Sequence, residues 1–171
     1  MMKRLILLSV VLALAAPIHA QTGPLPVQFS MTLNKKKKQV SAGYGNAADY
    51  FVSSSLRIVV NNVSARPLTG VKVRWGMVQQ NSYSSRRPVT YGAEETIDIQ
   101  PLKEKIVETQ PLQTRGREYE FIGKHGESVL GYGAQVLIDG KVVAQKTVPA
   151  NFSIDFEKLT PIESDSDNRR R

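Results

Sequence analysis

The stretch LRIVVNNVSARPLTGVKVRWGM, residues 56–77, carries the pattern that decides the fold of this chain. Apolar side chains occupy every second position up to Val60, and the alternation resumes from Val71 to Met77. A period of two predicts two β-strands, each with one face in a core and the other in water. The asparagines, proline and glycine between them predict a turn where the first strand ends.

The same short alternation recurs on both sides of this stretch. It predicts a first strand over residues 27–33, short strands around residues 97–99 and 106–109, and a final hairpin over residues 130–148. The lone tryptophan, Trp75, stands on the third strand, where immunoglobulin-like sandwiches keep their core indole. We therefore predict an all-β fold, an immunoglobulin-like antiparallel β-sandwich of about seven strands. The expected core consists of Leu56, Ile58, Val60, Val71, Val73, Trp75 and Val136.

The final hairpin allows two registers around Asp139-Gly140. A two-residue turn would set Val142 opposite Leu137 and would mix apolar and polar side chains on each face. A three-residue loop over residues 138–140 pairs Leu137 with Lys141 instead. It then gathers one apolar face, made of Tyr132, Ala134, Val136, Val142 and Ala144. Because register follows the buried face, we prefer the three-residue loop.

Residues 1–20 have the pattern of a secretory signal peptide. Lys3 and Arg4 form a positive start, residues 5–16 are apolar, and Ala20 supplies the small side chain before a cleavage site. The apolar run is too short to span the ~30 Å hydrocarbon core of a bilayer. We predict cleavage after Ala20 and a protein that is secreted, periplasmic or associated with the outer membrane, with no transmembrane span.

The rest of the chain is expected to form one domain and a tail. A length of 171 residues fits a single domain, and 41% hydrophobic residues suffice for a core. We assign residues 21–156 to the sandwich. Residues 157–171 are acidic and then basic with almost no apolar side chains, which predicts a flexible charged tail.

Catalytic and metal-binding chemistry has few residues to use in this sequence. Cysteine is absent, which excludes disulfides, thiol nucleophiles and thiolate metal sites. His125 is the one histidine after the signal peptide, and it lies between glycines in a predicted solvated turn, residues 123–126. Glu94 and Glu95 are adjacent, so on a strand they point to opposite faces. We predict no catalytic, cofactor or metal site, and a protein that is not an enzyme. An exported sandwich without cysteine also favours a bacterial origin.

The tract Lys35, Lys36, Lys37 and Lys38 follows the predicted first strand and precedes a predicted loop over residues 41–48. The net charge of +8 raises the question of an acidic partner. The tract could bind an acidic polymer, or it could keep a sheet edge soluble and unpaired. No aromatic residue is interleaved with the lysines, and the chain is expected to be exported, so we predict no nucleic-acid partner.

Two Gly-Tyr-Gly motifs, residues 43–45 and 131–133, offer a second candidate surface. They are not phosphate loops, because no change from strand to helix accompanies them. Their tyrosines could serve as platforms for sugar rings, or they could mark strand ends with the ring packed against the core.

Residues 56–64 (LRIVVNNVS) and 68–75 (LTGVKVRW) resemble the middle of bacterial extracellular sandwiches of the cell-adhesion-related kind, and residues 99–102 (IQPL) resemble their next corner. Residues 131–144 (GYGAQVLIDGKVVA) are similar to small secreted verrucomicrobial proteins with an immunoglobulin-like fold. Some of those proteins are associated with type IV pilus gene clusters and the outer membrane. The resemblance implies an envelope interaction module and brings no catalytic residues. A pilin subunit is not expected, because the chain from Gln21 onward is polar and extended.

The leading hypothesis is therefore a non-catalytic module of the bacterial envelope, accessory to type IV pili or to adhesion, that binds protein partners through loops or a sheet edge. Its first strand is the expected edge. The alternative is a carbohydrate- or polyanion-binding module that uses the Tyr/Gly loops and the lysine tract.

Overall fold

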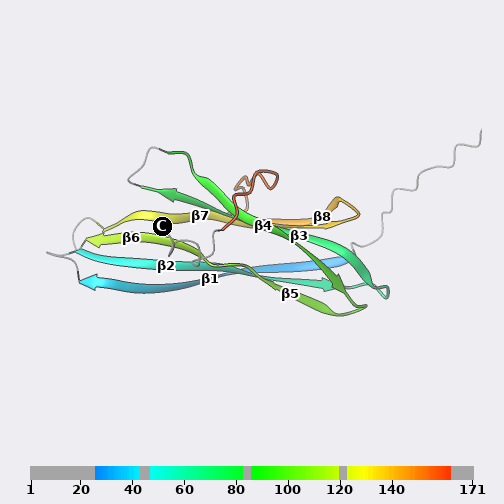
Figure 1. Ribbon diagram of the computed structural model, residues 1–171. Helices are drawn as coiled ribbons and strands as arrows, with labels where there is room; N and C mark the ends of the chain where they lie inside the picture. The colour runs from blue at the N-terminus through cyan, green and yellow to red at the C-terminus, as the bar shows by residue number, and fades with distance from the viewer. Residues whose placement is uncertain (1–25, 43–46, 83–85, 120–122, 163–171) are drawn as a thin grey trace, which may run out of the picture.

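The computed structural model describes residues 26–42, 47–82, 86–119 and 123–162, and within them the chain forms eight strands and no helix (Figure 1). All strand pairs are antiparallel, which confirms the predicted all-β antiparallel sandwich, with eight strands where about seven were expected. The strands are β1 Val27–Ala42, β2 Ala47–Asn62, β3 Leu68–Asn81, β4 Val89–Ile99, β5 Glu104–Glu108, β6 Leu112–Tyr119, β7 Gly123–Ile138 and β8 Lys141–Val148.

The strands form two layers that share β7. In the first sheet, β2 pairs with β1 on one side and with β5 and β6 on the other. In the second sheet, β3 lies between β4 and β7, and β8 pairs with the far side of β7. The start of β7 pairs with β6 up to Gly126, and the rest pairs with β3 (Figure 1). Gly126 has a φ of 121°, a conformation that suits glycine, where β7 crosses between the sheets.

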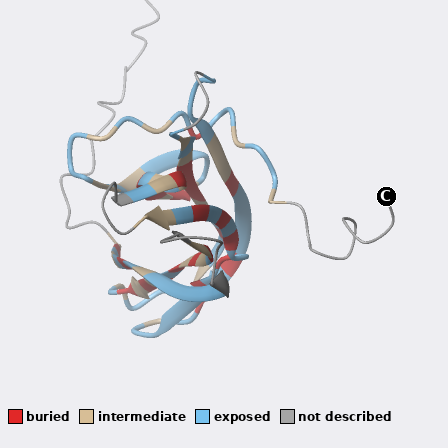
Figure 2. Cartoon of the chain, turned by 90° about the vertical axis from the view of Figure 1, so that its left-hand side faces the viewer, coloured by how far each residue is buried: buried red, intermediate tan, exposed pale blue. Residues whose placement is uncertain are grey.

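The core cluster takes its buried residues from the strands of both sheets, and the buried segments are red in Figure 2. All seven residues of the expected core are buried, and Trp75 has an exposed fraction of 4%. Trp75 lies opposite Ala93 on β4 and Ala134 on β7, so its two cross-strand neighbours are small. That arrangement leaves room for the large indole to pack toward the first sheet.

The turn after β2 is organised by one buried asparagine. Asn62 is 2% exposed, and its Nδ2 donates to the carbonyl oxygens of Arg66 (2.7 Å), Ile99 (3.3 Å) and Gln100 (3.2 Å). Its Oδ1 accepts from the backbone N–H of Ser64 at 2.9 Å. The Asn residue that ends the strand in the sequence therefore joins its own turn to the corner after β4, and its burial is compensated by hydrogen bonds.

The preferred register of the final hairpin was wrong. Ile138 pairs with Lys141, so the loop is the two-residue turn Asp139-Gly140, with φ values of 51° and 75°. Leu137 lies opposite Val142, but Val136 lies opposite Ala144, so one residue, Val143, is inserted as a bulge. The bulge brings Ala144 onto the face of the buried Val136, whereas Val142 stays opposite Leu137 and is 49% exposed, an arrangement that simple alternation does not predict.

The first strand is also longer than predicted. β1 continues through the lysine tract to Ala42, where the sequence predicted an end at Leu33 and a loop over residues 41–48. Fifteen residues of β2 pair along its length, and this pairing outweighs the weak strand preference of lysine. The loop prediction was wrong for residues 41–42 and 47–48, which belong to β1 and β2. Residues 43–46 lie outside the described residues. The predicted turn at 123–126 is the first part of β7.

Residues 150–162, called the C-terminal strap here, cross the outer face of the second sheet. Thr160 donates its N–H to the Thr90 carbonyl (2.8 Å) and accepts from the Gly92 N–H (2.9 Å). Phe156 is buried. Thr160 thus attaches the strap to β4, and Glu157 contacts Arg74 of β3, where the sequence predicted a flexible tail from residue 157. The predicted signal peptide and residues 163–171 lie outside the described residues.

Candidate binding surfaces

The pleat of β1 divides the lysine tract between two faces. Lys35 and Lys37 share the parity of the buried Met31, and they pair with Ser54 and Val52 on β2. Lys36 and Lys38 point to the opposite, outer face of the first sheet. The four lysines therefore do not form one site. If the tract had been predicted as a strand, the alternation of side chains would have assigned the odd-numbered and even-numbered lysines to opposite faces from the sequence alone.

On the outer face of the first sheet, an exposed aromatic side chain lies between two cations. Phe51 is 37% exposed and pairs with Lys38 on one side and with Arg115 of β6 on the other. The Arg115 guanidinium carbon lies 5.8 Å from the centre of the Phe51 ring, within cation–π range. We call Lys36, Lys38, Phe51 and Arg115 the basic row. Phe51 and Arg115 were missed by the sequence reasoning.

An ion pair borders the basic row. Arg117 donates to both carboxylate oxygens of Asp49, from Nε at 2.7 Å and from Nη2 at 3.2 Å. This bidentate pair is the largest cause of the raised pKa of Arg117, with smaller contributions from Tyr119. A pocket of about 410 Å³ lies beside this pair. Since Arg117 is already neutralised by a fixed carboxylate, it adds little to the attraction for an anion.

Between the layers, the inward lysines border a second, smaller pocket, called the inner pocket here. Its volume is about 180 Å³, and Lys124 at the start of β7 completes its basic rim. The Lys37 ammonium lies 2.6 Å from Glu118 Oε2 and 4.5 Å from the centre of the Tyr50 ring. The hydrogen bond from Lys37 is the largest cause of the lowered pKa of Glu118.

Two edge strands, β1 of the first sheet and β4 of the second, differ in what covers them. The strand β8 is a shorter edge of the second sheet, since among the described residues it pairs only with β7. Among the described residues, β1 pairs with β2 and with no other strand. At the opposite end of the strand order, the free side of β4 is bridged by Thr160 of the C-terminal strap. A strand edge with unpaired N–H and C=O groups is a template for another chain. β1 therefore offers the longer exposed edge.

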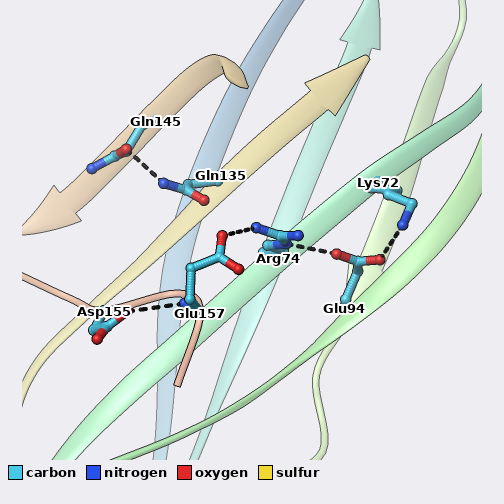
Figure 3. A network of polar contacts seen from close by, with 7 residues as sticks. All are labelled: Lys72, Arg74, Glu94, Gln135, Gln145, Asp155 and Glu157. Atoms are coloured by element: carbon cyan, nitrogen blue, oxygen red, sulfur yellow. Dashed lines mark hydrogen bonds and ion pairs between the residues drawn. The ribbon is translucent and has the colours of Figure 1, made fainter. Parts of the chain in front are cut away.

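The strap is held by a polar network on the outer face of the second sheet (Figure 3). Arg74 donates to Glu94 at 2.6 Å and to Glu157 of the strap at 2.5 Å, and Lys72 donates to Glu94 at 2.7 Å. The hydrogen bond from Lys72 is the largest cause of the lowered pKa of Glu94, and the hydrogen bond from Arg74 is the second. The hydrogen bond to Glu94 is in turn the largest cause of the raised pKa of Arg74. Glu94 is therefore tied into a structural ion-pair network and is poorly placed to accept a proton near neutral pH.

The remaining sequence candidates lie in structural positions. His125 belongs to β7, opposite Arg117, and its ring meets that of Tyr119 edge-on at 5.9 Å, so it is half-buried in a sheet and not solvated in a turn. Tyr132 packs against the core. Tyr44 lies outside the described residues. Within the described ranges, no three His, Asp or Glu side chains gather as metal ligands would, and no helix has the length and apolarity to cross a membrane.

Comparison with known proteins gives distant structural similarities only. No protein-family model and no curated protein matches the chain. A crystal structure from Akkermansia muciniphila is 13% identical, with 84% of this chain and 85% of that chain covered and a TM-score of 0.36. The Northeast Structural Genomics Consortium target SoR45 is 11% identical, with 74% of this chain and 92% of that chain covered and a TM-score of 0.28. Similarity at this level says nothing of function.

Proposed function

We propose that this protein is a non-catalytic interaction module of the bacterial envelope that binds a partner chain along the free edge of β1. The observation that carries the proposal is a 16-residue strand that pairs on one side only within the described residues. A partner strand laid along β1 would satisfy its free N–H and C=O groups, and alternate side chains would give specificity.

The two halves of β1 are suited to different tasks. Lys35 and Lys37 point inward from the edge strand, and inward-pointing charges are a known device against uncontrolled strand pairing. Residues 27–34 carry no charged side chain. Pairing is therefore proposed along residues 27–34, with the lysine half limiting how far a partner strand extends.

The location follows from the sequence. The signal-peptide pattern of residues 1–20 and the absence of cysteine support export from a bacterial cell. The module is then secreted, periplasmic or held at the outer membrane. An accessory role at type IV pili or in adhesion is the specific form of this proposal, and it rests on the family resemblance of residues 56–75 and 131–144.

An acidic glycan is the second candidate partner, and the basic row supports it. Phe51 offers an exposed ring, with Lys38 and Arg115 on either side. A sugar ring stacked on Phe51 would place acidic substituents near both cations. This surface is on the outer face of the first sheet, so it can be separated experimentally from the edge of β1.

Photo-crosslinking in intact cells tests the edge. A photoreactive amino acid replaces Gln28 or Thr32 on β1, and Thr96 on β4 serves as an exposed control position. We expect both β1 positions to trap the same envelope protein, identified by mass spectrometry, and the Thr96 position to trap none. The added change Ser30→Lys should weaken the product, because lysine on an edge strand opposes pairing. Equal products from β1 and β4, or an unchanged product in Ser30→Lys, would contradict edge pairing.

A further inference from the structure

We propose that the inner pocket binds a small organic monoanion, namely a carboxylate carried on a short apolar body. This site is separate from the free edge of β1, and it does not depend on the proposed partner chain. It is lined by residues of β1, β2 and β6 of the first sheet and by residues near the beginning of β7.

The size of the pocket restricts the ligand. Its volume of about 180 Å³ is below the ~300–1,000 Å³ of sites for drug-sized molecules. Val52, Val129 and the ring of Tyr50 supply apolar lining, and Lys35, Lys37 and Lys124 supply the charged part. A ligand with one charged end and a few carbon atoms matches this division.

The charges around the pocket leave an excess of one positive charge. Three ammonium groups and the carboxylate of Glu127 line it, and Glu118 is the ion-pair partner of two of those ammonium groups. Glu118 lies 2.6 Å from Lys37 and 3.7 Å from Lys124, so a single carboxylate serves two lysines. Glu127 accepts a hydrogen bond from the backbone N–H of Arg115. Lys35 has no ion-pair partner among the described residues, and a bound carboxylate would supply one.

Ser54 gives an independent indication. It lines the pocket, is 0% exposed, and its hydroxyl has no hydrogen-bond partner among the described residues. Buried hydroxyl groups are almost always paired, so an unpaired one needs an explanation. The edge-protecting role of inward lysines accounts for Lys35 and Lys37. It does not account for Lys124, which comes from β7, or for the unpaired Ser54 hydroxyl on the same pocket.

Ligand titration of the purified protein tests the site. Amide chemical shifts are followed while sodium hexanoate, sodium acetate or sodium phosphate is added, with ionic strength held constant by sodium chloride. We expect saturable shifts at the amides around Ser54, Lys124 and Val129, with hexanoate bound more tightly than acetate. Absence of saturation would overturn the proposal. Phosphate bound as tightly as hexanoate would overturn the assignment of an organic ligand.

Paired variants separate the pocket from the general basicity of the strand. Lys35→Ser with Lys37→Ser should raise the Kd for hexanoate about tenfold, the order expected from losing charge-assisted contacts. Lys36→Ser with Lys38→Ser removes the same charge from the same strand on the other face, and should leave the Kd within about twofold. Equal loss in both pairs would show an unspecific charge effect and overturn the site. Ser54→Ala should weaken binding without loss of stability, whereas an unchanged Kd would remove Ser54 from the site.

Discussion

The outer faces of the two sheets differ in whether another segment of the described chain covers them. The outer face of the second sheet is covered by the C-terminal strap, which is tied to it by Glu157 and Thr160. The outer face of the first sheet carries the basic row and has Phe51 exposed at its centre. At the edges, the strap bridges β4, whereas β1 and the shorter β8 each pair on one side only among the described residues. Within the described residues, the strap covers the outer face of the second sheet, called the covered face here, whereas the outer face of the first sheet, called the open face here, keeps Phe51 exposed.

Glycine makes the covering of the second sheet possible. A side chain at Gly131 would come within 2.5 Å of the Phe152 ring, and one at Gly76 would lie 3.2 Å from the Ile154 side chain. Gly133 likewise faces Ile154 at 3.0 Å. The missing side chains leave space in which the strap approaches the sheet closely. The first sheet has Phe51, Ser53 and Arg115 in the corresponding outward positions.

The largest expected loss of stability comes from a change in the core, which supports both sheets. Trp75→Ala removes the largest side chain of the shared core, which is 4% exposed, and should lower the free energy of unfolding by about 3–5 kcal/mol. Chemical denaturation measures the loss. Phe51→Ala is the aromatic control on the open face, and it should cost less than about 1 kcal/mol. Similar losses of stability in the two variants would mean that Phe51 is packed as tightly as a core residue and that the outer face of the first sheet is covered.

The next effect concerns only the covered face. Gly131→Ala places a methyl group against Phe152 and should destabilise the protein by about 1–3 kcal/mol through overpacking. Hydrogen exchange of the Thr160 N–H should accelerate, because the strap must shift away from β4. Gln113→Ala, an exposed change on the first sheet, should alter neither quantity. If Gly131→Ala left Thr160 as protected as in the wild type, the strap would not depend on the glycines.

The core was predictable from the sequence, and the strap was not. Alternation places Val71, Val73 and Trp75 on one face wherever β3 lies in the fold, so the core could be assigned residue by residue. Residues 150–162 have no period, and their attachment depends on Gly76 and Gly131, which are far from them in the sequence. A glycine in a strand signals a close approach but does not name the segment that approaches.

The candidate surfaces were predictable only in part for a similar reason. The lysine tract was visible, but its division between two faces depends on its pairing with β2, which is a long-range contact. Once that pairing is known, the positions of Lys36 and Lys38 beside Phe51 follow from the pleat. Lys124 and Ser54 meet at the inner pocket because the start of β7 pairs with β6, which in turn pairs with β2, and no local pattern contains that information.

A smaller effect links the strap to pH. The pKa of Glu94 is lowered in the folded protein by Lys72 and Arg74, so the folded state favours the ionised carboxylate. The resulting stability is fully present above the ordinary glutamate pKa of about 4.3, and it is lost as pH falls through the lowered value. Because the side chains are partly exposed, we expect less than about 1 kcal/mol. Urea midpoints between pH 6 and 3 should fall less in Glu94→Gln than in the wild type. Parallel curves would remove Glu94 from the pH dependence.

The smallest expected effect on stability is on the open face, where binding should change instead. Lys36→Ser with Lys38→Ser alters exposed side chains and should leave the free energy of unfolding within about 0.5 kcal/mol. The same pair should elute from a heparin column at lower salt than the wild type, because these charges face the solvent beside Arg115. Lys35→Ser with Lys37→Ser should shift elution less, since Lys37 is already paired with Glu118 at 2.6 Å. A larger shift from the inward pair would place the polyanion contact at the pocket rim and not on the basic row. If both double variants eluted at the same salt concentration as the wild type, the lysines would contribute no polyanion binding and would serve only to protect the edge. Binding at the first sheet would then be limited to the free backbone groups of β1.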